Sequence, residues 1–151
     1  RSSDLAASMG MTLTGVQKHV QGMKDALVVV TIITDGMENA SRVYNGKTIK
    51  ELVERLRGEG WTFTYMGANQ DSVEVAMSMS IRNARNFDYS NEGTRASMQK
   101  DSSTRMNLFG RLAKWKTAEM KGCCAVPASE SERRNLYANM ADEAFDEEEN
   151  K

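Results

Sequence analysis

One eight-residue segment constrains the fold of this chain more than any other. Residues 27–34 read Leu-Val-Val-Val-Thr-Ile-Ile-Thr, a short apolar and β-branched run without a polar face. Such a run predicts a strand that is buried on both faces, as in parallel sheets covered by helices on both sides. Asp35-Gly36 follows at once, and the chain must turn there. We therefore expect a parallel sheet with helical crossovers.

The segments that follow alternate between helical and strand patterns. Apolar residues recur at helical spacing most clearly over residues 48–57, and Gly58 and Gly60 mark the end of that helix. The patterns predict helices over residues 4–23, 48–57, a short stretch from 71, and 92–118, and strands over 27–34, 61–66 and 86–89. This order predicts an α/β fold, a partial doubly wound (Rossmann-like) parallel sheet flanked by helices. We expect five residues of the last helix to be buried, namely Met98, Met106, Phe109, Leu112 and Ala113.

Charge divides the chain into two parts. Residues 1–129 hold 17 Lys and Arg against 13 Asp and Glu, whereas residues 130–151 hold 3 against 8. We predict a domain over residues 1–121 and a linker with a flexible, disordered acidic tail over 122–151, with at most a transient helix around 136–145. The adjacent Cys123 and Cys124 are typical of reduced thiols in a cytoplasmic protein, not of a zinc site or a disulfide framework. No apolar run approaches the ~20 residues of a membrane helix, so no membrane partner is expected.

Polar residues follow the two main predicted strands. Asp35 comes directly after the first strand, and Asn69 lies in the turn after the second. Ligands of open α/β sheets bind at the carboxyl ends of the strands, so these residues are candidates for a site. Gly36, Glu38, Asn39 and Ser41 are nearby in sequence, and hard oxygen ligands of this kind suit Mg²⁺ or Ca²⁺. Turn and capping roles explain the same residues without a ligand.

The segment 29–41, Val-Val-Thr-Ile-Ile-Thr-Asp-Gly-Met-Glu-Asn-Ala-Ser, resembles the strand and loop of the von Willebrand factor A fold that end in Thr-Asp-Gly. It looks especially like a bacterial and phage group with Asp-Gly-x-Glu-Asn-Ala-Ser at this place. Residues 60–69 are similar to that group's next strand and turn, and the resemblance covers roughly residues 3–115. It implies a binding module of Rossmann type, not an enzyme.

The resemblance also implies a metal-ion-dependent adhesion site, of which this chain carries only a part. Asp35 matches the Asp of the family's third loop, and Ser3 stands where the Thr of the second loop would be. Ala7 replaces an Asp, and the Asp-x-Ser-x-Ser loop has no counterpart. One carboxylate and one hydroxyl fall short of the six or more oxygens that a hard cation takes, so we expect Mg²⁺ or Ca²⁺ to bind weakly at most. The start at Arg1, without an initiator Met, is consistent with a chain that begins inside a longer reading frame.

Partners follow from the strands that the family has and this chain lacks. The strand over 27–34 can pair on one side with the strand after Gly60, and its other side is left as an open apolar edge. We expect a protein partner, or self-association, at this edge. The alternative is a nucleic-acid-associated protein that uses the basic helix 95–121, which has seven basic residues around Trp115. An enzyme is the third hypothesis, since no G-x-S-x-G, P-loop or G-x-G-x-x-G motif occurs.

Overall fold

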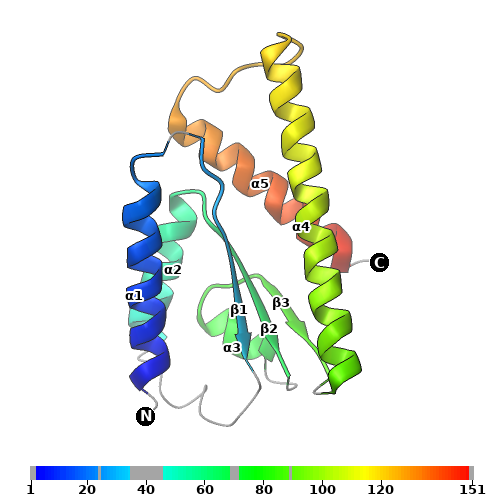
Figure 1. Cartoon of the computed structure of the whole chain (residues 1–151). Coiled ribbons are helices and arrows are strands. Elements are labelled where there is room, and N and C mark those ends of the chain that lie inside the picture. Colours follow the sequence, from blue (N-terminus) through cyan, green and yellow to red (C-terminus); the bar gives the residue numbers. More distant parts are fainter. Residues whose placement is uncertain (1–2, 24, 35–45, 69–71, 89, 150–151) are drawn as a thin grey trace.

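The computed structural model describes residues 3–23, 25–34, 46–68, 72–88 and 90–149 (Figure 1). The helices are α1 (Ser3–Val20), α2 (Gly46–Gly58), α3 (Ser72–Ser78), α4 (Asn91–Met120) and α5 (Glu130–Glu149), and the strands are β1 (Val29–Thr34), β2 (Thr62–Gly67) and β3 (Asn83–Asn86). The α/β class is therefore confirmed, with helices and strands alternating as far as α4. The third strand covers Asn83–Asn86, whereas the sequence predicted a strand over 86–89. The predicted position was too late in the chain because it relied on the aromatic residues at 87 and 89.

The three strands form a parallel sheet in the order β1-β2-β3. Val29 pairs with Thr62 and Thr34 with Gly67, so β1 and β2 are in register over their whole length. All six residues of β2 are buried, as expected of the central strand. β1 differs from the prediction of a strand buried on both faces, because it is the edge strand and its residues are half-buried or exposed.

Helices cover both faces of the sheet (Figure 1), with α1 and α2 on one side and α4 and α5 on the other. The first face carries the larger core. Its centre is made by the aromatic residues of β2, Phe63 and Tyr65, against Leu13 of α1 and Val53 and Leu56 of α2. The alternation of Thr with aromatic residues in β2 sends the aromatic side chains to this face.

The second face is more polar, since β1 and β2 place threonines there. Thr31 and Thr64 share a hydrogen bond between their hydroxyl oxygens, 2.8 Å apart. Beside this pair, Leu108 of α4 packs with Ala141 and Ala144 of α5 in a small apolar cluster. The two helices thus enclose their own apolar core against the sheet.

The carboxyl-terminal region corrects the prediction of a disordered tail over 122–151. Residues Glu130–Glu149 form α5, which buries Tyr137, Ala141, Ala144 and Phe145. These four residues recur at helical spacing and define one face. The other face carries most of the acidic residues, and their abundance hid the apolar face from a reading based on composition.

Gly60 connects α2 to β2 in a conformation that suits only glycine. Its φ is +92°, and an added Cβ would lie 2.7 Å from Cβ and 2.9 Å from the carbonyl oxygen of Arg134 in α5. We expect Gly60→Ala to lower the free energy of unfolding by about 2–4 kcal/mol through backbone strain and overpacking. Gly58→Ala is the matched control, because nothing lies within 4 Å of an added Cβ there. That helical substitution should be neutral or should stabilise by up to about 1 kcal/mol in urea titrations. Equal effects of the two variants would contradict the close approach of α5.

Candidate functional site

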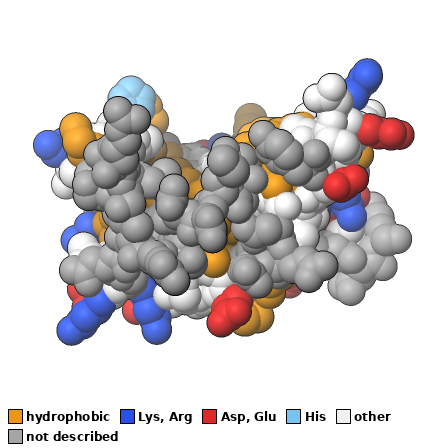
Figure 2. Space-filling model, turned by 90° about the horizontal axis from the view of Figure 1, so that it is seen from below, with side chains coloured by type: hydrophobic (Ala, Val, Ile, Leu, Met, Phe, Trp, Pro, Cys, Tyr) orange, Lys and Arg blue, Asp and Glu red, His pale blue; other side chains and the backbone are white. Residues whose placement is uncertain are grey.

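The carboxyl edge of the sheet is where the sequence places its candidate ligands. Thr34 and Gly67 are paired in the last register position of β1 and β2, so the two strands end at the same edge of the sheet. Figure 2 looks onto this edge, and the charged side chains of the described residues lie at its margin. The predicted residues Asp35, Gly36, Glu38, Asn39, Ser41 and Asn69 all lie outside the described residues.

Within the part of the chain that the structure describes, no group of three or more His, Cys, Asp or Glu side chains is arranged to hold a metal ion. Ser3 is the first residue of α1, but its side chain, like Asp35, is not among those described. Nor is any described helix both long enough and apolar enough to span a membrane.

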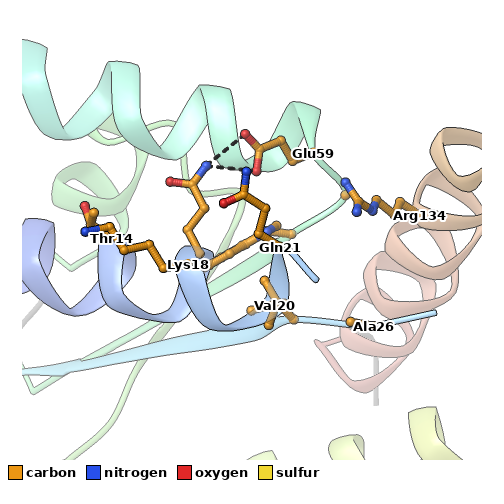
Figure 3. Close-up of a pocket in the computed structure, with 11 residues that line it drawn as sticks. Thr14, Lys18, Val20, Gln21, Ala26, Glu59 and Arg134 are labelled. Atoms are coloured by element: carbon orange, nitrogen blue, oxygen red, sulfur yellow. Dashed lines mark hydrogen bonds between the residues drawn. The ribbon is translucent and has the colours of Figure 1, made fainter. Parts of the chain in front are cut away.

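A cleft lies at the opposite, amino edge of the sheet (Figure 3). Its volume is about 520 Å³, and it is bordered by the end of α1, the start of β1, the α2–β2 connection and Arg134 of α5. The Gln17 side-chain amide donates to both carboxylate oxygens of Glu59, at 3.0 and 3.2 Å, and ties α1 to the end of α2. Lys18, Gln21 and Arg134 supply further N–H donors to the cleft.

The lining of this cleft combines one carboxylate with several N–H donors. Glu59 is the one carboxylate among the lining residues, and the lining holds neither a His nor a Cys. The sequence predicted helices, strands and the glycine turn for these residues, and it assigned none of them to a binding site.

The outer edge of β1 is the second candidate surface. Thr62 N–H donates to the carbonyl of Val28, at 3.0 Å, so the backbone groups of Val28 point toward β2. Backbone groups alternate in direction along a strand, and those of Val29, Thr31 and Ile33 therefore point away from β2. Among the described residues no backbone group pairs with them, and the sheet ends at this strand.

β1 carries apolar side chains on both faces, with Thr31 between Val29 and Ile33 on the second face, although the strand is at an edge. Val30 and Ile32 pack toward the core under α1 and α2, and Val29 packs toward Leu108 on the other face. Ile33 lies on that second face and is 49% exposed. An edge strand normally carries charged residues or proline to prevent pairing with other chains, and β1 carries neither. β3 at the opposite edge is shorter and polar, with the sequence Asn-Ala-Arg-Asn.

The buried face of α4 differs from the predicted one. Met106 and Phe109 are 72% and 54% exposed, Met98 is 38% exposed, and Ala113 is also exposed, while Leu112 is half-buried. The buried residues of this helix are Ser97, Thr104 and Leu108. The prediction was wrong because it assigned the larger side chains to the core, whereas the small Ser97 and Thr104 allow α4 to approach the sheet and α5.

The exposed apolar side chains of α4 form a stripe on a definite side of the helix. Arg111 pairs with Glu147 of α5, and this contact marks the side of α4 that faces α5. Arg105 donates a hydrogen bond to Thr31 of β1, and this contact marks the side that faces the edge strand. Around the circumference of the helix, Met106 and Phe109 lie on the opposite side of Arg105 from Arg111, by helical geometry. We call Met98, Met106, Phe109 and Ala113 the α4 stripe; it lies next to the open edge of β1.

Three of the seven basic residues over 95–121, which suggested nucleic-acid binding, form ion pairs within the chain. The pairs are Arg105 with Asp101, Arg111 with Glu147 and Lys116 with Asp25. The rings of Trp115 and Tyr137 meet edge-on, with their centroids 5.8 Å apart. The Arg133 guanidinium lies over the Trp115 ring, 5.4 Å from the centroid of that ring. These contacts leave fewer free cations than the sequence suggests and occupy the aromatic ring that could stack on a base.

The amino end of β1 is fastened to α4 and α5 by a polar cluster that the sequence analysis missed. We call Asp25, Lys116, Arg133 and Tyr137 the Asp25 cluster. Lys116 Nζ lies 2.7 Å from Asp25 Oδ2, Arg133 lies 3.6 Å from Oδ1, and the Tyr137 hydroxyl donates to Oδ1. Asp25 has a φ of 69°, which Asp and Asn tolerate better than most residues. Its partners are 91 or more residues away in sequence, and no local motif could reveal them.

Charges in the Asp25 cluster shift one another's pKa values. Burial raises the pKa of Asp25, but the hydrogen bonds from Lys116 and Tyr137 and the nearby cations outweigh it and lower the pKa below 3.8. The hydrogen bond to Asp25 in turn raises the pKa of Lys116 above 10.5. Burial is the main cause of the raised pKa of Tyr137. The cluster is therefore fully charged at neutral pH, with Tyr137 protonated.

Acid should weaken this cluster. Because the folded-state pKa of Asp25 is lowered, its contribution to stability is present above pH 3.8 and is lost as the pH falls through the lowered value. Asp25→Asn should reduce the free energy of unfolding at pH 7 by about 1 kcal/mol and flatten its decline below pH 4. Asn keeps the tolerance for positive φ, so the effect reports the charge. Urea titrations at several pH values check this, with the exposed Glu51→Gln as control. An Asp25→Asn curve parallel to that of the wild type would contradict it.

Comparison with protein-family models, curated proteins and solved structures gave no match to this chain.

Proposed function

We propose that this chain is a non-enzymatic protein-binding module that takes up a strand of another polypeptide along the outer edge of β1. One observation carries the proposal: an edge strand with apolar side chains on both faces, without charged residues, has unpaired backbone groups at Val29, Thr31 and Ile33 among the described residues. Backbone pairing of this kind supplies affinity, and the alternating side chains of the incoming strand supply specificity.

The ligand of such an edge has a defined chemistry. Ile33 and the α4 stripe leave apolar area uncovered on one side of the sheet. On the other side Val30 and Ile32 are only half-buried. An incoming strand must therefore carry apolar side chains on both of its faces, as an interior strand of a parallel or mixed sheet does. The resemblance to the von Willebrand factor A fold supports the same view, because the matching strand lies inside the sheet of that family.

Selection of peptides tests this function. A library of ten-residue peptides, displayed and selected on the immobilised chain, should yield extended binders with apolar residues on both faces. Ile33→Pro removes one outward N–H without touching the β1–β2 ladder and should abolish their binding. Asn86→Pro is the matched control, because Phe87 N–H bonds to Gly67 and the backbone of residue 86 therefore points away from β2 at the other edge. Binding that survives Ile33→Pro in a folded variant would contradict the proposal.

The metal site enters the proposal as an incomplete one. Asp35 and Ser3 are its candidate ligands, and two oxygen-bearing side chains cannot enclose a cation that takes at least about six oxygens. Calorimetric titration with Mg²⁺ or Ca²⁺ should therefore give no micromolar constant. A micromolar constant that disappears in Asp35→Ala would show instead that the chain completes the site.

A further inference from the structure

We propose that the polypeptide taken up at this edge is a second copy of the same chain, with the two β1 strands antiparallel about a twofold axis and the two α4 stripes packed against each other. The inference rests on the proposed function and adds the identity of the partner. A dimer of this kind closes on itself, because a twofold axis leaves no further copy of the edge exposed.

The backbone of β1 is complementary to itself. In an antiparallel pair, two opposing residues whose backbone groups both face the partner exchange N–H···O=C hydrogen bonds. Val29, Thr31 and Ile33 all face outward, and Thr31 is the middle one. An axis through Thr31 places it opposite the partner's Thr31, and it places Val29 opposite the partner's Ile33. Every outward N–H and C=O group of this stretch then finds a complement.

The α4 stripe is centred on the same axis. Arg105 reaches Thr31 through its hydrogen bond, so residue 105 marks the level of the proposed axis along α4. Met98 and Ala113 lie at nearly equal distances before and after this residue, and Met106 is adjacent to it. α4 runs along the sheet in the direction opposite to β1 (Figure 1). The axis therefore brings the two α4 helices together antiparallel, with Met106 of both copies near the axis.

Charge permits this contact. By helical spacing, the residues of α4 on the stripe side between 98 and 113 are Met98, Ser102, Arg105, Met106, Phe109, Leu112 and Ala113. Arg105 is the one ionised residue among them, and it is held by Asp101 and Thr31. About this axis the two Arg105 side chains face each other, and each guanidinium keeps Asp101 of its own chain as its counterion. Helices that pack side by side have axes about 8–10 Å apart, roughly two strand spacings, so a paired sheet brings neighbouring helices into contact.

Sedimentation equilibrium of the full chain from about 1 to 100 µM tests the inference, because specific dimers of modest interface dissociate in this range. The wild type should fit a monomer–dimer equilibrium. Met106→Glu places two unpaired carboxylates near the axis and should weaken the dimer on the order of 100-fold. Ser103→Glu is the matched control, since Ser103 is exposed and lies at the same level of α4 but, by helical spacing, outside the stripe side. It should leave the dimer unchanged, and circular dichroism should show both variants folded.

A proximity measurement gives a second reading. Met106→Cys, made with Cys123→Ser and Cys124→Ser, should form an intermolecular cross-link with a short bismaleimide. The same change at Met120 should not.

The outcomes separate this inference from the proposed function. A chain that stays monomeric throughout, or that forms open-ended oligomers, overturns the twofold dimer, while peptide binding lost in Ile33→Pro would still support the edge as a protein-binding site. A dimer that Ile33→Pro dissociates but Met106→Glu does not overturns the packing of the α4 stripes. A dimer indifferent to both variants overturns the inference entirely.

Discussion

Truncation after Val126 is expected to abolish the cooperative unfolding transition of this chain. The deletion removes α5, whose buried residues Tyr137, Ala141, Ala144 and Phe145 face α4 and the sheet. Truncating one buried aromatic side chain to Ala costs about 3–5 kcal/mol, and a domain of this size is stable by about 5–15 kcal/mol. Loss of the whole helix should therefore leave a chain without a sigmoidal melting curve by circular dichroism.

Two point variants separate the buried face of α5 from its acidic face. Phe145→Ala should lower the free energy of unfolding by about 3–5 kcal/mol, because Phe145 is buried. Asn139→Ala, on the exposed face of the same helix, should change it by no more than about 0.5 kcal/mol. A truncated chain that melts at the wild-type temperature would show that the acidic region is dispensable after all, as its composition suggested.

The second large effect is expected at Leu108, which joins α4 to α5 and to Val29 of β1. Leu108→Ala should cost about 2–5 kcal/mol, because the side chain is fully buried and its neighbours lie in α5, in β1 and in the segment before β1. Met106→Ala should change the stability by no more than about 0.5 kcal/mol, since Met106 is 72% exposed. Both values should come from urea titrations at low protein concentration, where association does not contribute.

The sequence favoured the opposite ranking, with Met106 buried and Leu108 unassigned. If Met106→Ala lowered the free energy of unfolding strongly and Leu108→Ala only slightly, the buried face of α4 would be nearly half a turn away from the face described here. In that case the stripe would be core, and the dimer argued above would lose its basis.

Local pattern was sufficient for the order of the elements. The short apolar run over 27–34 and the alternation over 61–66 each indicated a strand from local sequence alone. Both segments form strands, and the two strands pair in parallel. α2 was equally clear, because four apolar residues at helical spacing end at glycines. The weakest signal was that of β3, whose polar sequence has no alternation, and its position was misjudged by about three residues.

The sequence by itself determined the α/β class, the sheet with β1 next to β2, and the position of the candidate ligands after the strands, because each of these follows from short-range periodicity and chain direction. Tertiary structure decided which face of α4 is buried, because the helix has apolar residues on more than one side and only packing against α5 and β1 selects among them. It also decided the fate of the acidic region. The composition of α5 reflects its many charges, whereas its folding depends on a few apolar residues on one face. Those residues stabilise the helix only when they pack against Leu108 and the sheet.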